Sequence, residues 1–413
     1  MILVVFTSSY PYDFINEKTF HSGEMRTLRK YFDRVIYVPR NAVGNLQEES
    51  GLIEVDSSYS RMFSPWRQFL FAVYGLFTRL FYEDLKDLSP VSFSVGYIRR
   101  LISFLSGVYL TRQWVRQWFK REKVSDQEVV FYTFWFDESS TGIGLAKLEH
   151  PHLRLVSKAH GFDIYEELYK PWPLRKRSIS MLDGLFADSA VGRSYLRNKY
   201  PEFGSRYQVS LLGVPDPGGV SYPSIDEGLR IVSCSTTAGL KRLDLLLDGV
   251  KTAAHERPYQ RFEWIHFGDG PDREIYIERI KAKFPPNAKG FFPGYTSVID
   301  LVDFYLNNPI DVFVNVSKTE GTSVAIMEAI SCGIPVIATS VGGNVEIVQE
   351  KNGMLLSENP TPDEIADALL SVCDNREVWL EKRKGSRDVW QERYNETTNF
   401  EAFAQALVEI RKR

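Results

Sequence analysis

The 413-residue sequence predicts an α/β fold with two domains, each built on a parallel β-sheet covered by helices. Strand-like runs alternate with helix-length periodic segments, a pattern typical of parallel sheets with crossover helices. The chain also exceeds the roughly 250–300 residues beyond which one hydrophobic core seldom grows. Its densest cluster of Pro, Gly and Ser separates two sets of strand-like runs. We therefore expect a first domain at 1–213, a linker at 214–228 and a second domain at 229–395.

Each sheet is predicted from its strand-like apolar runs. The first domain is expected to hold strands at 2–6, 34–39, 128–134 and 153–161, and the second at 229–235, 262–268, 310–317 and 334–340. Residues 396–413 are expected to form a helix that packs back on the first domain.

The composition is that of a folded globular protein, with 44% hydrophobic residues, 25% charged residues and a formal net charge of -3. This balance gives no reason to expect a nucleic-acid partner. Cys234, Cys332 and Cys373 are odd in number and widely spaced, which indicates neither a disulfide framework nor a metal site. The N-terminal apolar run lacks a basic flank and is too short for a signal peptide. We therefore expect a cytoplasmic protein.

Two carboxylates, Glu320 and Glu328, stand in one of the most apolar stretches of the chain, VSKTEGTSVAIMEAISC at 316–332. The pattern predicts a βαβ unit, with a turn at Gly321, a helix after a Thr322 or Ser323 cap, and Gly333 beyond the helix end.

In open parallel sheets, ligands settle beyond the carboxyl ends of the strands, where a helix N-terminus offers amides to an anion. Glu320 is predicted to lie at such a strand end. Glu328 lies about two turns into the helix, where its carboxylate could accept hydrogen bonds from a diol such as a ribose. The alternative is that Glu328 is an ordinary exposed helical residue.

The arrangement resembles the signature of the retaining GT-B glycosyltransferases of family 4, or glycosyltransferases group 1. The shared pieces are Glu320, Glu328, Ala329, Gly333 and Pro335, then LKRLDLLL at 240–247, HFGDGP at 266–271, PGYTS at 293–297 and VGGNVEIVQEKNGMLL at 341–356. In the first half, TSSYPYDFINEKTF at 7–20 and SKAHGFDIYEE at 157–167 are similar to acceptor-domain motifs of polysaccharide-building members. The resemblance covers nearly the whole chain except about 45–128.

This resemblance implies a GT-B architecture, in which two Rossmann-like domains face each other across a cleft that holds a nucleotide-sugar. The implied activity is transfer of the sugar, with retention of anomeric configuration, to a glycan or lipid-linked glycan in bacterial cell-surface polysaccharide biosynthesis. By motif, the donor site would comprise Lys241, Arg242, Gly268, Gly294, Gly321, Thr322, Ser323 and Glu328, and the catalytic residues would be His160, Asp163 and Glu320.

Within that site, the resemblance places Lys241 and the amides of 321–323 at the phosphates and Glu320 at the donor sugar. His160 and Asp163 would face the reacting sugar from the first domain. Without the resemblance, two alternatives stay open: a structural or a catalytic role for His160, and a helix-capping or a catalytic role for Asp163.

The chemistry requires positive charge, because a pyrophosphate leaving group gathers negative charge in the transition state. The sequence has no Asp-X-Asp pair, so neither a metal nor another cofactor is expected. Lys241, Arg242 and the helix at 323 are the candidates instead. In this family the leaving phosphate is usually taken to accept the acceptor's proton, so Glu320 is not assigned as a nucleophile. One departure is Thr236, where many members carry an Arg.

Positive charge and aromatic residues concentrate at 61–123, which holds 11 Lys and Arg, 4 acids and 15 aromatic residues. Two interpretations stay open. The segment lies on an anionic membrane surface, with Trp114, Trp118 and Phe119 in contact with lipid, which makes the protein peripheral on the inner face of the cell membrane. Alternatively, the segment forms amphipathic helices packed on the first domain, with the basic residues solvated.

Two other functions fit the same architecture. One is a sugar-nucleotide epimerase, which needs no acceptor, and the other is a non-catalytic scaffold of a glycan-assembly complex. The sequence names neither the donor base and sugar nor the acceptor and linkage.

Overall fold

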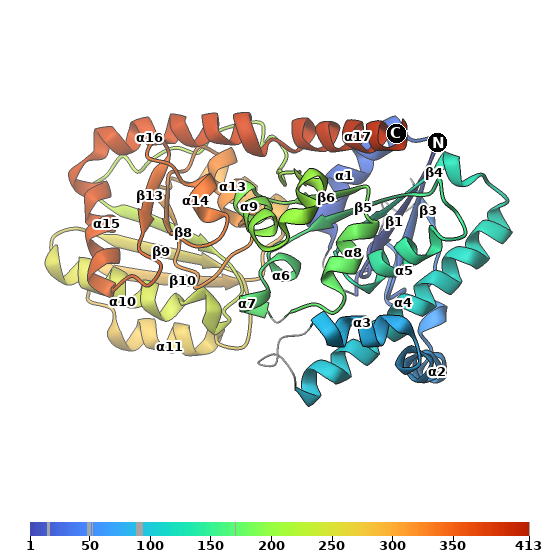
Figure 1. The fold of residues 1–413 in the computed structure, drawn as a ribbon. Helices are drawn as coiled ribbons and strands as arrows, with labels where there is room; N and C mark the ends of the chain where they lie inside the picture. Colours follow the sequence, from blue (N-terminus) through green and yellow to red (C-terminus); the bar gives the residue numbers. More distant parts are fainter. Residues whose placement is uncertain (15–16, 48–50, 52, 88–93, 170, 413) are drawn as a thin grey trace. The chain divides into compact units, whose positions relative to one another are not determined.

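The computed structural model describes residues 1–14, 17–47, 51, 53–87, 94–169 and 171–412 (Figure 1). The chain divides into two compact units: unit 1 comprises Met1–Ser210 with Phe400–Arg413, and unit 2 comprises Leu211–Asn399. Two residues of the 7–20 motif, 15 and 16, lie outside the described residues, and so do residues 88–93 of the basic aromatic segment. Each unit contains one parallel sheet, as the alternating pattern predicts.

Unit 1 is built on a seven-stranded sheet with the order β3-β2-β1-β4-β5-β6-β7. All its registered pairs are parallel, which places the carboxyl ends of the strands at one edge. The strands are β1 Ile2–Thr7, β2 Arg34–Pro39, β3 Glu54–Val55, β4 Val129–Thr133, β5 Arg154–Ala159, β6 Gly184–Ala187 and β7 Tyr207–Val209.

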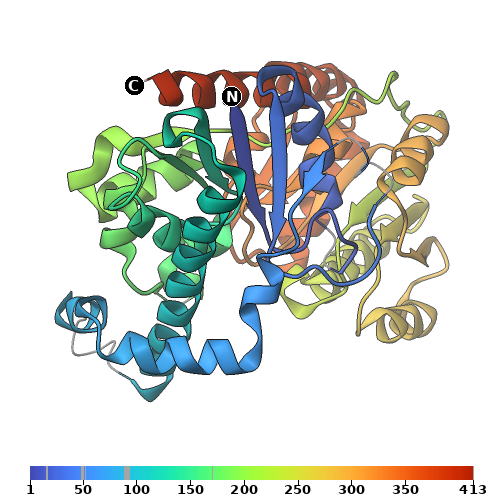
Figure 2. The ribbon, with the colours of Figure 1, turned by 90° about the vertical axis from the view of Figure 1, so that its right-hand side faces the viewer.

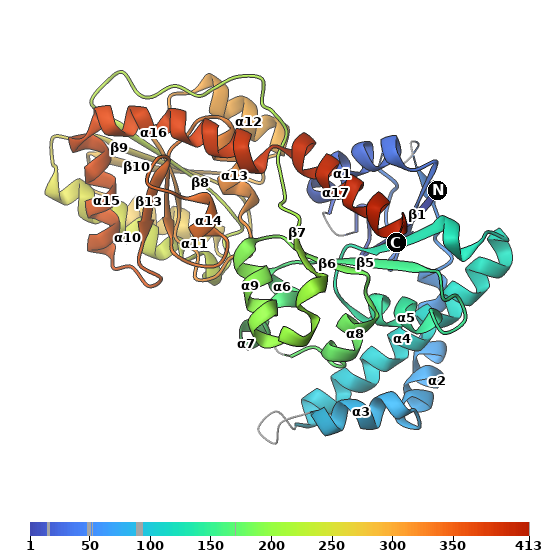
Figure 3. The same ribbon diagram turned by 45° about the horizontal axis from the view of Figure 1, so that its top comes forward.

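Helices cover both faces of this sheet, because successive strand residues point to opposite faces and both sets are apolar. Leu3 and Val5 belong to the core formed with α1 (Lys18–Tyr31) and α17 (Glu396–Lys412). Val4 and Phe6 belong to the core on the other side, formed with α4 (Val95–Glu122) and α5 (Glu138–Ala146). Figure 3 shows α17 beside α1. The remaining helices are α2 Pro65–Leu76, α3 Arg79–Asp87, α6 Gly161–Ile164, α7 Glu166–Tyr169, α8 Arg175–Met181 and α9 Ala190–Lys199.

The basic aromatic segment does not behave as one surface, and its best-buried part is α4. Trp114, Trp118 and Phe119 are buried in the core against the sheet, so the expectation that these three side chains contact lipid is wrong. The charge of α4 is also paired locally, since Arg112 and Arg116 both donate to Glu149.

Most aromatic residues of α2, in contrast, are exposed: Trp66, Phe69 and Tyr74, with Phe77 directly after the helix. Phe71 packs against the core. Figure 2 shows α2 at the end of α4 that lies away from the sheet of unit 1. Among the described residues, no helix has both the length and the hydropathy that crossing a membrane requires.

Unit 2 is built on a six-stranded parallel sheet with the order β10-β9-β8-β11-β12-β13. The strands are β8 Leu229–Cys234, β9 Phe262–Phe267, β10 Ala288–Gly294, β11 Val312–Asn315, β12 Val336–Thr339 and β13 Gly353–Leu356. The helices are α10 Leu243–Glu256, α11 Arg273–Lys283, α12 Val298–Asn307, α13 Val324–Ser331, α14 Asn344–Ile347, α15 Pro362–Asp374 and α16 Arg376–Val389. Helices α10, α11 and α15 share one core with the strands.

The predicted βαβ unit around the two glutamates is confirmed. Strand β11 is followed by α13 and then by β12, which pairs with β11 in parallel. Gly333 follows the last turn of α13 with φ +70°, a conformation that glycine adopts without strain. This unit brings the residues after β11 to the carboxyl edge of the sheet.

The burial difference between two tryptophans of the basic aromatic segment can be measured as stability. We expect Trp118→Ser to lower the free energy of unfolding by about 3–5 kcal/mol, because it removes a fully buried ring and leaves a cavity. Trp66→Ser, at a side chain that is 63% exposed, should change it by less than about 0.5 kcal/mol. Denaturant unfolding of both variants gives the comparison, and equal losses would contradict the burial of α4.

Candidate functional site

The candidate donor site lies where the strand order of unit 2 reverses. Strands β8 and β11 are neighbours in the sheet but not in sequence, and the connections leaving them run to opposite sides. In open parallel sheets this reversal opens a crevice beyond the carboxyl ends of the two strands. The loops that leave β8 and β11 carry Lys241 and Glu320 respectively. Residues 79 positions apart are thereby brought together.

Lys241 and Glu320 form an ion pair, with the Lys241 ammonium 2.6 Å from the Glu320 carboxylate. The same carboxylate oxygen accepts a hydrogen bond of 3.3 Å from the side-chain amide of Asn315, the last residue of β11. Sequence reasoning did not single out Asn315, although its position at the end of an apolar strand was a usable signal. The pair supplies one cation for a phosphate and one acceptor for a hydroxyl.

Arg242 also lies at this edge, but its guanidinium donates its hydrogen bonds to the protein backbone. It donates to the backbone carbonyls of Val316 and Ser317 at 2.7 and 2.8 Å, and to that of Glu358 at 2.9 Å. These bonds tie the start of α10 to the loops after β11 and β13. The geometry indicates a positioning residue, and a direct role of Arg242 at the diphosphate stays a prediction.

Glu328 is buried in α13, with 5% of its surface exposed, so the alternative that it is an ordinary exposed helical residue is wrong. Among the described residues, none donates a hydrogen bond to its carboxylate. Burial raises the pKa of Glu328 to about 7, because the charged form loses its hydration. A buried carboxylate without a partner is costly for the fold, and a ligand with hydroxyl groups would supply the missing donors.

Close contacts between main chains shape the same edge. Gly268 follows β9 with φ +134°, and a Cβ there would stand 1.8 Å from the carbonyl oxygen of Ser235. Gly342 has φ +51°, and its Cβ would stand 1.8 Å from the carbonyl oxygen of Glu320. Both positions require glycine, because a side chain would push apart the loops that carry the ion pair. Gly342 belongs to the 341–356 motif but was not predicted as a site residue.

The remaining predicted donor residues lie at the same edge of the sheet. Gly294, with φ +93°, accepts a hydrogen bond from the Gly268 amide at 2.9 Å. Ser323 is the N-cap residue of α13, so Gly321 and Thr322 lead directly into the N-terminus of that helix. The carbonyl of Gly321 accepts from the Gly343 amide at 2.6 Å. Thr236, the expected departure from the pattern of the resembled family, is exposed in the loop after β8.

In unit 1, His160 and Asp163 adjoin each other after β5. Asp163 is buried, and its carboxylate accepts from the backbone amides of His160 and, at 2.7 Å, of Phe136. Burial raises the pKa of Asp163. Its oxygens thus hold two backbone segments, which indicates a positioning residue, and contact with a reacting sugar stays a prediction.

The His160 ring lies near Phe134 and Trp135, with 8% of the residue exposed. Its Nδ1 is 3.6 Å from Asp188, and its Nε2 has no hydrogen-bond partner among the described residues. A ring nitrogen without a partner can accept a hydrogen bond from a ligand or donate one to it. The catalytic role of His160 stays a prediction.

A cluster that sequence reasoning missed lies on α1, close to His160. Lys158 and Glu24 form an ion pair that is almost completely buried. Beside them His21 is fully buried, and burial lowers its pKa to about 4. The signal was available in SKAHG, where a lysine sits inside an apolar strand. Over the described residues, no group of three His, Cys, Asp or Glu side chains is arranged to hold a metal ion.

The buried Glu328 predicts a pH-dependent stability. Its pKa in the folded state, about 7, lies above the ordinary glutamate value of 4.5, so stability falls as pH rises between these values. Glu328→Gln removes that loss, and should raise the free energy of unfolding at pH 8 by on the order of 3 kcal/mol and change it little at pH 5. Denaturant unfolding at both pH values tests this, with Glu381→Gln on the exposed surface of α16 as the control. A variant less stable than the parent at pH 8 would contradict the burial argument.

Comparisons with known proteins converge on one family. Residues 229–375 match the family model "Glycosyl transferases group 1". The chain is 30% identical over 158 residues to the phosphatidylinositol N-acetylglucosaminyltransferase gpi3 subunit of Schizosaccharomyces pombe, covering 38% of this chain and 32% of that protein. A match to sucrose-phosphate synthase 4 of Arabidopsis thaliana is 38% identical over 73 residues, covering 18% of this chain and 7% of that protein. The chain thus spans less than two thirds of the length of these curated relatives.

Solved structures match over the whole chain at lower identity. The lipopolysaccharide outer core galactosyltransferase WaaB aligns with a TM-score of 0.68 and 16% identity over 99% of both chains. HepE of Anabaena in complex with UDP aligns with a TM-score of 0.65 and 15% identity, also over 99% of both chains. The likeness to these structures shows the fold, and the family model shows similarity over residues 229–375. Residues 229–375 are therefore similar to the glycosyl transferases group 1, and the whole chain has the GT-B fold of the solved glycosyltransferases that it matches.

Proposed function

We propose that the protein is a glycosyltransferase that moves a sugar from a nucleotide-sugar donor to a glycan or lipid-linked glycan acceptor. One observation carries the proposal: Lys241, Glu320 and the buried Glu328 occupy one edge of the unit 2 sheet, at its topological switch point. These groups match the three parts of a nucleotide-sugar. Lys241 meets the diphosphate, Glu320 a hydroxyl of the sugar, and Glu328 the diol of the ribose.

The mechanism proposed for this site needs no protein nucleophile. As the bond between the sugar and the diphosphate breaks, charge grows on the leaving oxygen, where Lys241 and the N-terminus of α13 stabilise it. The leaving phosphate accepts the proton of the attacking acceptor hydroxyl on the same face, so the configuration is retained. Lys241 takes the part that a metal plays in other transferases, and we propose metal-independent transfer.

The structural neighbours and sequence relatives support one class of donor, the UDP-sugars. Solved structures of HepE from Anabaena contain UDP and UDP-glucose, and the sequence relatives include an N-acetylglucosaminyltransferase subunit. The structural neighbour WaaB is a galactosyltransferase of the lipopolysaccharide outer core. We therefore propose a UDP-sugar as donor and a cell-surface glycan as acceptor.

A thermal-shift screen tests the proposed function directly. A ligand that binds the folded state alone stabilises it by about 2.7 kcal/mol at 100 times its Kd. UDP-glucose and UDP-N-acetylglucosamine should therefore raise the unfolding temperature, and GDP-mannose and ADP-glucose should raise it less. Proton NMR of the product glycoside would then report its anomeric configuration. Absence of a shift with all four donors would contradict the proposal.

Removing the Lys241 charge should weaken donor binding. A hydrogen bond to a charged group contributes about 1.5–3 kcal/mol, so Lys241→Met should raise the Kd for UDP-glucose roughly 10- to 150-fold. Turnover should fall further, because the charge on the diphosphate grows toward the transition state. Isothermal calorimetry measures the first effect, with Lys281→Met on the exposed surface of α11 as the matched control. Equal affinities of the two variants would place the diphosphate elsewhere.

We also propose that α2 is the part of the protein that meets an anionic membrane surface. Its exposed apolar side chains include Trp66, Phe69, Leu70 and Tyr74, and Phe77 follows directly after the helix. The other side of α2 packs against α4. Arg61 and Arg79 flank the helix and are exposed. Aromatic side chains together with basic residues favour the interface of an anionic bilayer. A peripheral enzyme held there would meet lipid-linked acceptors.

Vesicle co-sedimentation tests the role of α2. The parent protein should bind vesicles that contain phosphatidylglycerol, and less so at high salt, because exposed charges are screened within about 10 Å at 0.1 M. The triple variant Trp66→Ser, Phe69→Ser, Phe77→Ser should lose most of this binding at unchanged unfolding temperature. Tyr259→Ser with Ile299→Ser, two exposed apolar side chains of unit 2, is the control. Undiminished binding of the triple variant would exclude α2 as the contact.

A further inference from the structure

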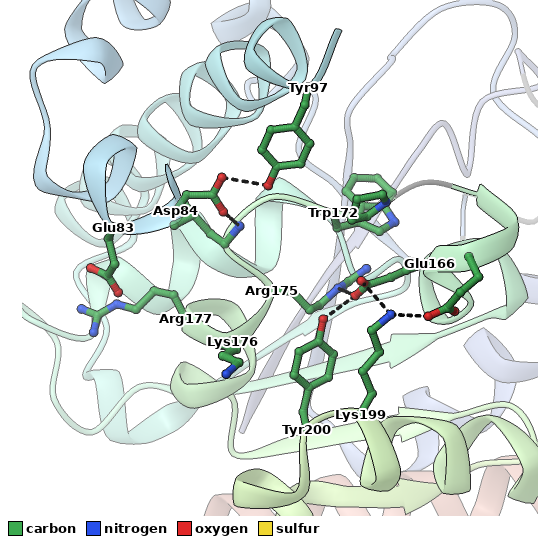
Figure 4. A pocket seen from close by; sticks show the side chains of 13 residues that line it. Glu83, Asp84, Tyr97, Glu166, Trp172, Arg175, Lys176, Arg177, Lys199 and Tyr200 are labelled. Carbon is green, nitrogen blue, oxygen red and sulfur yellow. Dashed lines mark hydrogen bonds and ion pairs between the residues drawn. The ribbon is translucent and has the colours of Figure 1, made fainter. Parts of the chain in front are cut away.

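A pocket of about 420 Å³ lies in unit 1, outside the candidate donor site of unit 2 (Figure 4). It is enclosed by α3, the first turn of α4, α7, α8 and the end of α9, and we call it the α3–α8 pocket. Its volume falls in the range of small-molecule sites, which is about 300–1,000 Å³. Neither the family match, which covers 229–375, nor the donor site accounts for it.

The walls of the α3–α8 pocket are fixed by hydrogen bonds between its own residues. Asp84 accepts from the Tyr97 hydroxyl at 2.8 Å and from the Leu174 amide at 2.5 Å. Glu166 accepts from the Tyr200 hydroxyl at 2.6 Å, and Lys199 lies 3.1 Å from the same carboxylate. These bonds join the helical segment before β4 to the helices after β5. The pocket is therefore preformed, so a ligand need not order it on binding.

The chemistry of the lining is balanced in charge and dense in polar groups. Four acids and four bases face the pocket: Glu83, Asp84, Glu166 and Glu167, with Arg175, Lys176, Arg177 and Lys199. A balanced set gives no net attraction for a phosphate, in contrast to a cluster of cations. Sugar hydroxyls both donate and accept, so they can bond to carboxylates and to cations alike.

An aromatic platform completes the lining. Trp172 is half-buried at the pocket, where its ring lies near Phe162 and the Arg175 guanidinium. An indole offers a flat apolar face and keeps a polar edge, which suits the C–H face of a pyranose ring. Figure 4 shows Glu83 and Arg177 pointing toward one another on the side of the pocket opposite Glu166.

We propose that the α3–α8 pocket binds a neutral oligosaccharide, namely the part of the acceptor glycan that does not react. This inference rests on the proposed glycosyltransferase function and names where the acceptor is held. Binding energy from such a remote part of a substrate can be used to position its reacting end.

A direct connection links the pocket to the His160 segment. The Arg175 guanidinium, which lines the pocket, donates to the backbone carbonyls of Phe136 at 3.1 Å and Asp163 at 2.6 Å. The Asp163 carboxylate in turn holds the amides of Phe136 and His160. A saccharide in the pocket thus sits one side chain away from the segment that carries His160, and Arg175 is a positioning residue between them.

The test measures saccharide binding to the full chain without any donor. Saturation-transfer difference NMR with maltotriose, cellotriose and chitotriose should detect at least one ligand, and inorganic phosphate should not compete with it. Trp172→Leu, which keeps apolar volume but removes the flat ring, should weaken that ligand about tenfold. Trp66→Leu, at an exposed tryptophan of α2, should bind as the parent does.

A second variant, Arg177→Ala, tests the pocket independently of Trp172. Arg177→Ala changes an exposed side chain of the lining, so it should weaken the saccharide without lowering the unfolding temperature, even if Trp172→Leu fails to fold. The inference is overturned if none of the three trisaccharides binds, if phosphate displaces them, or if Arg177→Ala and a folded Trp172→Leu bind them as the parent does. The donor screen is independent, because it reports on unit 2. UDP-sugar binding without saccharide binding would reject the pocket and leave the proposed function standing.

Discussion

The order reversal between β8 and β11 is the constraint on which the candidate donor site depends. The carboxyl ends of parallel strands lie at one edge of the sheet. At the order reversal the loops that follow two neighbouring strands lead in opposite directions, which leaves room for a ligand between them. Lys241 reaches this edge from one side and Glu320 from the other, so their 2.6 Å contact is a product of topology. Arg242 then fixes the loops by binding three backbone carbonyls.

The same site lowers the stability of unit 2 in two ways. Glu328 is buried without a hydrogen-bond donor among the described residues, and Gly268 and Gly342 hold main chains at distances that no other residue tolerates. Features of this kind persist in proteins when the surrounding structure compensates for them, and they concentrate at functional sites. Here the compensation is visible in α13, whose Ile326 and Met327 are fully buried beside Glu328. We infer that the cost is retained because a ligand relieves it.

Features of the fold and of the candidate site could be predicted where they depend on residues close together in the sequence. The eight predicted strands all occur, because long buried runs with turn signals identify parallel strands. Five strands of the described residues were not predicted: β3, β6, β7, β10 and β13. Strand β10, Ala288–Gly294, was missed because its two glycines and proline fit an edge strand and a turn alike. Glu320 and Glu328 were found because they share one βαβ unit, whereas the partners of Arg242 lie far away in sequence. Basic and aromatic residues at helical spacing fit a membrane surface and a packed helix equally well, so the burial of Trp118 depends on the rest of the fold.

The Lys241–Glu320 pair also bears on how a transferase could release its product. In the structure Lys241 donates to Glu320, and a diphosphate that took up this donor would leave the Glu320 carboxylate in need of another one. An intact nucleotide-sugar compensates, because a sugar hydroxyl can donate to the carboxylate that the lysine has left. A nucleoside diphosphate without the sugar would bind Lys241 but would donate no hydrogen bond to Glu320. Among the described donors, the Asn315 amide would then be the one that still donates to that carboxylate. At the proposed donor site, this exchange would favour the nucleotide-sugar over the nucleoside diphosphate, and re-formation of the ion pair would assist the release of the nucleoside diphosphate.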